Sequence, residues 1–265
     1  MILITPFLHA QKITSPYEWN WKKDGILTGA GLVGSGTGLL LIKSKKGISE
    51  NKLQSILNKQ ENINFLDKWV AGKNSDAASK ISDIPLALSF ATTFVLLLDD
   101  ETNDHTSQIL GLYLESMAIT GALYSITAGV VNRSRPYVYD NQNGLNRRLS
   151  SSGQRSFFSG HVAATTSASF FAAKVFQDFN PESGAIPYVW TGAVVLPAVV
   201  GYFRIQAGQH FLTDVLLGYG LGAAVGYFVP ELHKVSNDTN IRLTPIAGEI
   251  LSGDYYQGLK VSYTF

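Results

Sequence analysis

Residues 211–230 read FLTDVLLGYGLGAAVGYFVP, and this stretch decides the fold class. Asp214 is its one charged residue, and a run of about 20 mostly apolar residues is long enough to cross the hydrocarbon core of a bilayer. Small residues recur along the stretch, which is typical of helices that pack closely inside a membrane. The stretch predicts an apolar helix with a single carboxylate near its beginning.

Other parts of the chain show the same shortage of charge. Five further blocks contain one charged residue or none: 25–42, 84–98, 109–132, 161–176 and 185–203. We therefore predict an all-α fold, a transmembrane six-helix bundle. A soluble helical bundle with apolar central helices remains the alternative, because the mean hydropathy is only +0.08.

The composition excludes several classes of protein. The 265 residues include 21 Lys and Arg against 20 Asp and Glu, which gives a net charge of +1, and no Cys. A disordered chain combines low hydrophobicity with high net charge, and a nucleic-acid-binding protein usually carries a basic excess. Without Cys, the chain has no disulfide scaffold, thiolate metal site or Cys nucleophile.

The connectors and termini complete the predicted organisation. Residues 43–83 are polar, with apolar residues at partly helical spacing, and predict an amphipathic connector helix on a surface. Residues 133–160 predict a Gly/Ser-rich loop, and the loose alternation after residue 241 predicts a short C-terminal β-like tail, a hairpin. We divide the chain into three parts: an N-terminal segment at 1–24 whose first 11 residues resemble a signal remnant, a helical domain at 25–230 with core motifs at 128–214, and a tail at 231–265.

Two polar clusters lie at the beginning or end of apolar blocks. Arg133 and Arg135 follow the third block, and paired guanidinium groups suit the oxygens of a phosphate, although two interfacial arginines closing a membrane helix give the same pattern. Ser159 and Gly160 precede His161 at the start of the next block. A Ser cap and a Gly would leave backbone N–H groups facing an anion; an ordinary helix cap beside a surface His is the alternative.

A third polar cluster consists of Arg204, His210 and Asp214. The four-residue step predicts that His210 and Asp214 share one face of the last helix, where a carboxylate behind an imidazole fixes its tautomer. A structural ion pair is the alternative. Two other chemistries use the same residue types: zinc held by His161, His210 and Asp214, and an acyl-transfer triad of Ser159, His210 and Asp214.

One glycine motif is better explained by packing than by a cofactor. Gly29-x-Gly31-x-x-Gly34 satisfies the dinucleotide-binding fingerprint but lies inside an uncharged block without a preceding strand. We interpret these glycines as small residues for close contact between helices.

Together, Arg135-Pro136, Ser159-Gly160-His161 and Arg204-x5-His210-x3-Asp214 resemble the three-part signature of the type 2 phosphatidic acid phosphatase and vanadium haloperoxidase superfamily, in its lipid phosphatase branch. The resemblance implies a metal-independent phosphatase that hydrolyses a phosphomonoester or pyrophosphate of a lipid through a phosphohistidine. It implies no cofactor, except vanadate if the chain were a haloperoxidase.

The resemblance also implies a role for each matching residue. His210 corresponds to the nucleophile, Asp214 to the carboxylate that orients it, and His161 to the general acid. The phosphate cradle corresponds to Arg135, Ser159, Gly160 and Arg204.

Three positions depart from the signature. Ala128 stands where a Lys is expected, Phe158 replaces a Pro and Phe203 replaces a Ser. We expect Arg133 to take the place of the missing Lys in binding phosphate.

The expected partners are the membrane and a lipid phosphate or polyprenyl pyrophosphate, with no nucleic acid. The resemblance implies a multi-pass protein of the inner (plasma) membrane with an extracytoplasmic active site, whereas 14 of the 21 Lys and Arg fall on the active-site face and favour the cytoplasm. Three alternatives remain: an exported, membrane-associated soluble acid phosphatase, a vanadate-dependent haloperoxidase of the same superfamily, and a non-catalytic membrane structural or transport protein.

Overall fold

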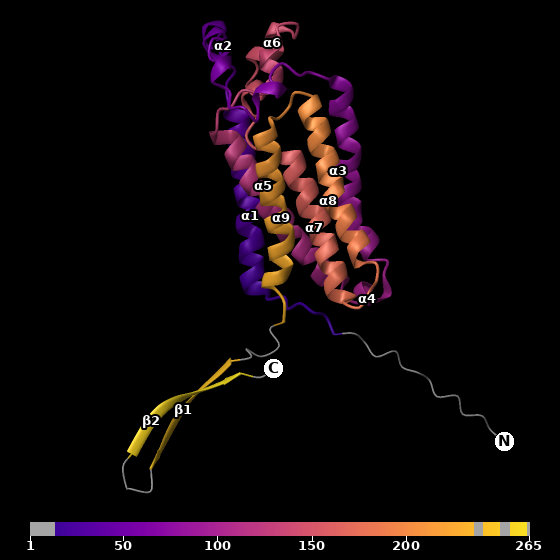
Figure 1. Cartoon of the computed structure of the whole chain (residues 1–265), viewed down its shortest axis with the longest axis vertical. Helices are drawn as coiled ribbons and strands as arrows, with labels where there is room; N and C mark the ends of the chain where they lie inside the picture. The colour runs from indigo at the N-terminus through magenta and orange to yellow at the C-terminus, as the bar shows by residue number, and fades with distance from the viewer. Residues whose placement is uncertain (1–13, 236–240, 250–254, 264–265) are drawn as a thin grey trace, which may run out of the picture. The chain divides into compact units, whose positions relative to one another are not determined.

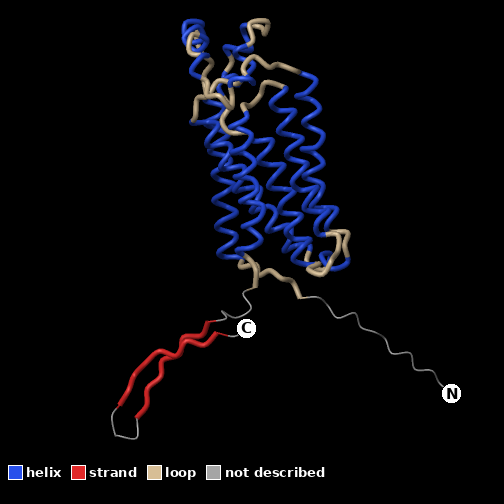
Figure 2. Tube along the Cα trace, in the orientation of Figure 1, coloured by secondary structure: helices blue, strands red, loops and turns tan. Residues whose placement is uncertain are grey.

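The computed structural model describes residues 14–235, 241–249 and 255–263. The helices are α1 Trp21–Ser44, α2 Glu50–Leu57, α3 Asp76–Leu96, α4 Asp100–Asn103, α5 Thr106–Val130, α6 Leu145–Leu149, α7 Gly160–Phe179, α8 Ile186–Gln206 and α9 Leu212–Leu232. Short 3₁₀ turns cover Gln60–Asn62, Lys68–Val70, Pro136–Tyr139 and Ser151–Gln154. The prediction of an all-α bundle with six long helices, α1, α3, α5, α7, α8 and α9, is confirmed (Figures 1 and 2).

The chain forms two units, residues 1–233 and 234–265, and each is described by itself. The second contains strands β1 Ile241–Glu249 and β2 Tyr255–Tyr263, which pair antiparallel with Ile241 opposite Tyr263. The predicted C-terminal hairpin is therefore present.

Helix α7 is the central helix of the bundle. It packs against α3, α5, α8 and α9, and its centre buries the hydroxyl-bearing side chains Thr165, Thr166, Ser167 and Ser169 (Figure 1). The other five long helices expose large apolar side chains outward, whereas no residue of α7 is exposed. This inside-out pattern suits a bundle surrounded by lipid.

Within the described residues, four helices, α1, α5, α8 and α9, are long and apolar enough to cross a membrane. The sequence analysis predicted six spans. Helix α7 differs because its Ser and Thr side chains face protein, and α3 because it begins with the charged turns of Asp76, Lys80 and Asp83. These two helices complete the bundle without forming continuous apolar spans of their own.

The connector between α1 and α3 is less helical than predicted. Only α2 is an α-helix there, and α3 already begins at Asp76, where the side chain of Ser75 accepts a hydrogen bond from the N–H of Ala78 at 3.2 Å. Leu53 of α2 is buried against Tyr137 and Val138, so the connector packs onto the 133–160 loop. Both segments lie at one end of the bundle (Figure 1).

Glycines bring two pairs of helices into close contact. Gly31, Gly34 and Gly38 of α1 face Ala118, Ala122 and Ser125 of α5. Gly31 and Gly34 of the dinucleotide-like motif are thus part of a helix interface, as predicted, whereas no atom lies within 4 Å of a Cβ placed on Gly29. On α9, Gly218, Gly222 and Gly226 lie one turn apart against α7: they contact the backbone carbonyls of its N-cap residue Ser159 and of Ala163 and Ser167. A side chain at any of these three positions would collide with α7.

We predict that Gly222→Ala destabilises the bundle by about 1–3 kcal/mol, because its Cβ would overlap the Ala163 carbonyl and force α7 and α9 apart. Thermal unfolding in detergent measures this. Gly220→Ala on the same helix is the matched control, since no atom lies within 4 Å of its Cβ. Equal stability of the two variants would contradict close α7–α9 packing.

Candidate active site

The predicted site residues gather at the end of the bundle that carries α2 and α6 (Figure 1). They come from the loop after α5, the start of α7, the end of α8 and the start of α9. Because the long helices alternate in direction, these segments meet at a common end although they are up to 81 residues apart in sequence.

The carboxylate of Asp214 connects three segments of this region. Its side chain is fully buried, and one carboxylate oxygen accepts hydrogen bonds from the Ser156 hydroxyl at 2.6 Å and from the Phe211 N–H at 2.9 Å. The other oxygen pairs with Arg133. A buried carboxylate needs such donors, because an unpaired charge in the protein interior is costly.

His210 lies before α9 rather than on it. Gly208 has φ +66° and packs against the backbone of Lys73 and the side chain of Tyr137, so the chain turns there in a conformation that suits glycine. The imidazole is only 2% exposed, and Nδ1 lies 2.6 Å from the Ser156 carbonyl oxygen. Donation of Nδ1–H to that carbonyl leaves the lone pair on Nε2.

The predicted contact of the His210 imidazole with Asp214 is therefore replaced by an indirect one. The two residues do not share a helix face, since α9 starts at Leu212 and Asp214 turns back to the N–H of Phe211. Ser156 joins them: its carbonyl accepts from His210 and its hydroxyl donates to Asp214. Sequence reasoning did not single out Ser156, and its position three residues before Ser159 was the only signal.

The guanidinium group of Arg133 forms ion pairs with two carboxylates. Its guanidinium pairs with Asp214 and, at 2.7 Å, with Asp67, and it donates to the Thr213 hydroxyl at 3.0 Å. The expectation that Arg133 replaces the missing phosphate-binding Lys does not fit this geometry, because both of its terminal nitrogens are engaged.

Asp67 is a second buried carboxylate that the sequence did not reveal. Burial would raise its pKa, but hydrogen bonds from Thr213, Asn64 and Arg133 outweigh burial and hold the pKa below its ordinary value. Asp67 thus stays ionised and fastens the connector to the first turn of α9. No pattern in the connector distinguishes this Asp from a solvent-exposed one.

The start of α7 presents unpaired donors. Ser159 occupies the predicted N-cap position, but its hydroxyl is buried and has no hydrogen-bond partner among the described residues. A Cβ on Gly160 would lie 2.6 Å from the Tyr124 ring, so only glycine fits there. The first N–H groups of the helix and a free hydroxyl together suit an anion.

Two further cations lie near His210. Arg204 is 5% exposed; one terminal nitrogen donates to the Ser82 hydroxyl at 3.3 Å, while Nε has no partner among the described residues. Arg135 bonds to the Gln209 side chain and, through Nε, to the Arg155 carbonyl at 3.3 Å. Burial lowers the pKa of His210 well below its ordinary value of 6.5, and the positive charges of Arg135 and Arg204 lower it further.

His161 contacts the carboxylate of Asp83, a residue that the sequence analysis did not assign to the site. Its Nε2 lies 3.2 Å from Oδ1 of Asp83 on α3. Asp83 marks the edge of an apolar block in the sequence, and nothing in the spacing connects it with His161. The imidazole is one-third exposed, so it can reach solvent or a ligand.

Ala128 stands where the family signature has a Lys, and a different lysine, Lys45, lies next to it. Ala128 is fully buried on α5, and its carbonyl accepts a hydrogen bond from Nζ of Lys45 at 2.9 Å. The same Nζ bonds to the carbonyls of Val131 and Gln154, so all three of its protons are used. Lys45 stabilises the end of α5, where the helix dipole is negative.

Arg155 is a cation that the sequence analysis did not include. Its Nε is buried without a partner, and its side chain forms no ion pair among the described residues. The charge of Arg155 adds to burial in lowering the pKa of Lys45 and of Arg135. It therefore lies beside Arg135 in the same electrostatic environment.

The two competing chemistries are not supported by this geometry. In the described residues the Ser159 hydroxyl makes no bond to His210, as an acyl-transfer triad requires. The two imidazoles and Asp214 turn to different partners, namely the Ser156 carbonyl, Asp83, and Arg133 with Ser156, rather than to a common metal position. What the site offers is a group of donors and cations near the buried imidazole of His210.

Comparison with known proteins agrees with this arrangement. Residues 109–238, which include every predicted site residue, match the model of the PAP2 superfamily. This segment belongs to the PAP2 superfamily. The PAP2 segment begins within α5 and ends beyond α9, so α1, α2 and α3 lie outside it although Asp67 and Asp83 contribute to the site.

Two individual proteins resemble the chain. A lipid A 4'-phosphatase from Porphyromonas gingivalis is 33% identical over 81 residues, which cover 31% of this chain and 31% of that protein. The chain thus spans about a third of the length of this curated relative. The crystal structure of a transmembrane PAP2 type phosphatidylglycerolphosphate phosphatase from Bacillus subtilis matches with 20% identity and a TM-score of 0.41, covering 80% of this chain and 92% of that one.

Proposed function

We propose that the chain is a metal-independent phosphatase that removes a phosphate group from a lipid through a phosphohistidine on His210. The observation that carries the proposal is the pair of buried, unpartnered donors, the Ser159 hydroxyl and Arg204 Nε, beside the first N–H groups of α7. Unpaired buried donors are costly, and a phosphate would supply the oxygens that they lack. Membership of the PAP2 superfamily supports the same conclusion.

The geometry accounts for the first step of the reaction. Neutral His210, with Nδ1–H held by the Ser156 carbonyl, attacks phosphorus with the lone pair of Nε2 while the bond from phosphorus to the lipid oxygen breaks. His161, in its protonated form, gives its proton to that leaving oxygen; burial and the charge of Arg204 lower the pKa of His161 to about 4, and the hydrogen bond to Asp83 opposes this and favours the imidazolium. Arg135, Arg204, Ser159 and Gly160 stabilise charge on the transferring oxygens.

The second step returns the enzyme to its starting state. Neutral His161 takes a proton from water, whose oxygen attacks phosphorus as the bond from phosphorus to Nε2 breaks. Inorganic phosphate leaves, His210 is again neutral, and His161 is again protonated. Asp214 acts on His210 only through Ser156, as a positioning residue.

The lipid nature of the substrate is supported by the surroundings of the site. Four apolar helices are long enough to cross a membrane, and the site lies at one end of their bundle (Figure 1). A lipid headgroup could enter there while its tails remain in the bilayer. The related Porphyromonas protein is named for a lipid phosphate, and the resemblance of the motifs favours an extracytoplasmic site in the plasma membrane.

We predict that His210→Ala lowers kcat by about 10³-fold or more, because the nucleophile is lost. His161→Ala should lower it by about 10²- to 10⁴-fold through loss of the general acid. Phosphate release is measured with phosphatidic acid, phosphatidylglycerol phosphate, lipid A, undecaprenyl pyrophosphate and a soluble ester, and the phosphoryl-enzyme is trapped with labelled substrate.

His105→Ala, outside the site, is the control and should keep full activity. Label on the protein that persists in His210→Ala would refute the phosphohistidine. Wild type that is inactive on all five substrates would refute the phosphatase, and a preference for the soluble ester would refute the lipid substrate.

The pH dependence should reflect the lowered pKa of His210. His210 must be neutral to attack, so activity should persist as the pH falls below 6.5 and disappear only as it passes through the lowered pKa. Arg135→Gln removes one of the cations that lower this pKa, and the acid limb of kcat/KM should therefore move to higher pH. Arg147→Gln, which removes an exposed pair with Asp76, should leave the limb in place. Substrate ionisation is the same in all three enzymes, so an unmoved limb in Arg135→Gln would contradict this assignment.

We also propose that Arg155 supplies the phosphate-binding charge that Lys provides elsewhere in the superfamily. Like Arg204, it has neither a carboxylate partner nor a satisfied Nε in the described chain, and its charge acts on Arg135. Arg155→Gln should lower kcat/KM by about 10²- to 10³-fold, as loss of one charge-stabilising donor does. Arg147→Gln again serves as the control, and equal activity of the two variants would contradict the role of Arg155.

A further inference from the structure

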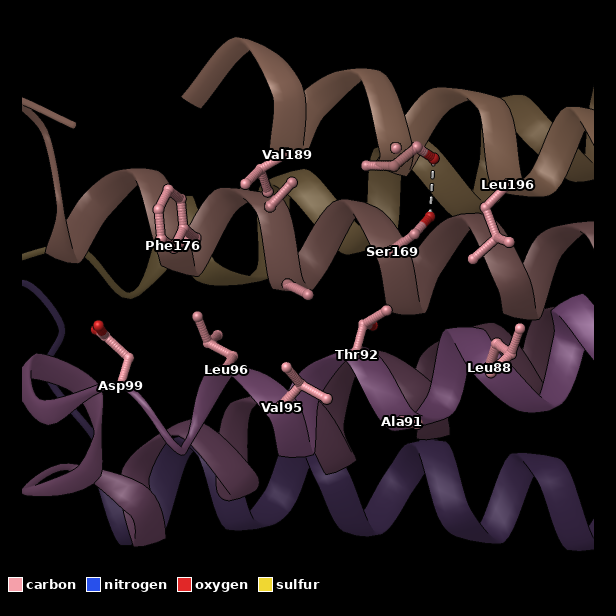
Figure 3. Close-up of a pocket in the computed structure, with 14 residues that line it drawn as sticks. Leu88, Ala91, Thr92, Val95, Leu96, Asp99, Ser169, Phe176, Val189 and Leu196 are labelled. Atoms are coloured by element: carbon pink, nitrogen blue, oxygen red, sulfur yellow. Dashed lines mark hydrogen bonds between the residues drawn. The ribbon is translucent and has the colours of Figure 1, made fainter. Parts of the chain in front are cut away.

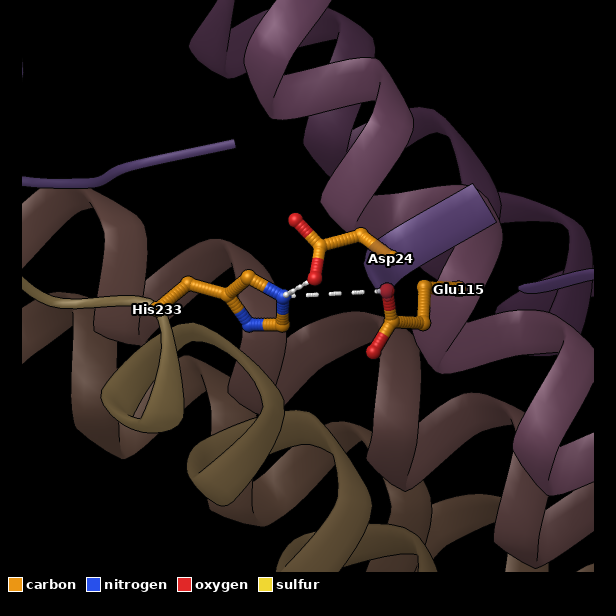
Figure 4. A group of neighbouring side chains, drawn as sticks. All are labelled: Asp24, Glu115 and His233. Atoms are coloured by element: carbon orange, nitrogen blue, oxygen red, sulfur yellow. Dashed lines mark ion pairs between the residues drawn. The ribbon is translucent and has the colours of Figure 1, made fainter. Parts of the chain in front are cut away.

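A second cluster of chemically active side chains lies at the opposite end of the bundle from the phosphate site. Asp24 is in the first turn of α1, Glu115 is on α5, and His233 follows the end of α9. One ligand atom of each lies within 4.8 Å of the others, and Figure 4 shows the three side chains converging on one point. We propose that Asp24, Glu115 and His233 bind a divalent transition-metal ion, with Zn²⁺ as the best-fitting one.

Unpaired buried atoms provide the first argument. Glu115 is 2% exposed and Asp24 1%, and Oε2 of Glu115 and Nε2 of His233 have no hydrogen-bond partner within the described part of the chain. These two atoms face each other at 3.7 Å. Two buried carboxylates beside one imidazole leave a negative charge that a divalent cation would neutralise.

The orientation of His233 provides a second argument. Its Nδ1 lies 2.7 Å from the Val229 carbonyl oxygen, so donation there leaves the Nε2 lone pair directed at Asp24 and Glu115. Metal-binding imidazoles usually donate their other N–H to a carbonyl or carboxylate in this way. The Trp19 ring stacks on the imidazole with centroids 6.2 Å apart, which restricts its rotation.

The carboxylate of Asp24 is held in a similar manner. Its Oδ2 accepts the N–H of Asn20 at 2.6 Å, which leaves Oδ1 facing His233. Each of these two ligands therefore has one atom fixed by the backbone and the other available. Such outer contacts align ligands before the metal arrives.

The distances fit a metal better than an ion pair. Nε2 of His233 lies 3.2 Å from Oδ1 of Asp24 and 3.7 Å from Oε2 of Glu115. Tetrahedral zinc with bonds of about 2.0–2.2 Å places its ligand atoms about 3.4 Å apart, which lies between these values. A charge-assisted hydrogen bond from an imidazolium would be shorter, about 2.7–2.9 Å.

A metal ion bound by Asp24, Glu115 and His233 would connect three helices. The ligands belong to the beginning of α1, the body of α5 and the end of α9, which are far apart in sequence (Figure 4). Because the cluster lies at the other end of the bundle from His210, this proposal does not depend on the proposed phosphatase. The expected role is stabilisation of the bundle rather than catalysis.

The test uses the full chain in detergent micelles after treatment with chelator. We expect the wild type to bind one Zn²⁺ per chain in equilibrium dialysis, and its unfolding temperature to rise with Zn²⁺ and fall again with chelator. Glu115→Gln and His233→Gln should each weaken binding by more than about 100-fold and abolish the rise. His105→Gln is the matched control on the same end of the bundle, and the double variant His161→Ala/His210→Ala removes zinc binding at the phosphate site; both should still bind one ion.

Other outcomes would overturn the proposal. Wild type that binds no zinc, or variants at Glu115 and His233 that bind as tightly as wild type, would exclude the site. A loss of stability in Glu115→Gln that is the same with and without Zn²⁺ would identify a simple ion pair. If the variants do not fold, Co²⁺ is added to the wild type, and a visible d–d spectrum that stays as weak as that of free aqueous Co²⁺ refutes the site.

Discussion

The burial of the Asp214 carboxylate is the constraint on which the rest of the proposed phosphate site depends. A fully buried carboxylate must be satisfied by donors, and here these come from Arg133, Ser156 and Phe211, in three separate stretches of the chain. Those same stretches carry the cradle, the start of α7 and His210. The hydrogen bonds that satisfy the Asp214 carboxylate therefore bring the three motifs together. The carbonyl of Ser156 in turn accepts a hydrogen bond from Nδ1 of His210 and fixes its tautomer.

Close packing of α7 and α9 sets the spacing within that network. Gly218 lies against the Ser159 carbonyl, where a Cβ would approach to 2.6 Å, and the Ser159 N–H in turn bonds to the Asp214 carbonyl at 3.1 Å. The row of Gly218, Gly222 and Gly226 on α9 thus extends from the interface with α7 into the site. A helix pair held apart by larger side chains could not place Ser159 and Asp214 in contact, so the requirements of packing and of phosphate binding coincide at this point.

Periodicity and charge predicted the long helices well, because each apolar block between charged connectors is a strong and local signal. The three motifs also met as predicted, since alternating helix directions bring their segments to one end. The partners of the motif residues were not predictable. Asp67, Asp83 and Ser156 are common polar residues whose roles arise from contacts across 58 to 78 residues of sequence. The prediction that His210 and Asp214 share a helix face was wrong, because α9 begins only at Leu212 and the carboxylate of Asp214 accepts the N–H of Phe211.

The cations at the phosphate end divide into two groups according to what neutralises them. Arg133 pairs with two carboxylates, and Lys45 gives its three protons to backbone carbonyls. Arg135, Arg155 and Arg204 form no ion pair in the described parts of the chain. Placing several unneutralised guanidinium groups near a buried imidazole is unfavourable unless an anion joins them. A phosphate monoester carries about −1.5 to −2 charges at neutral pH, which matches that excess more closely than a single carboxylate would. If Arg155 acts as proposed, the absence of Lys at position 128 leaves the charge required for phosphate intact.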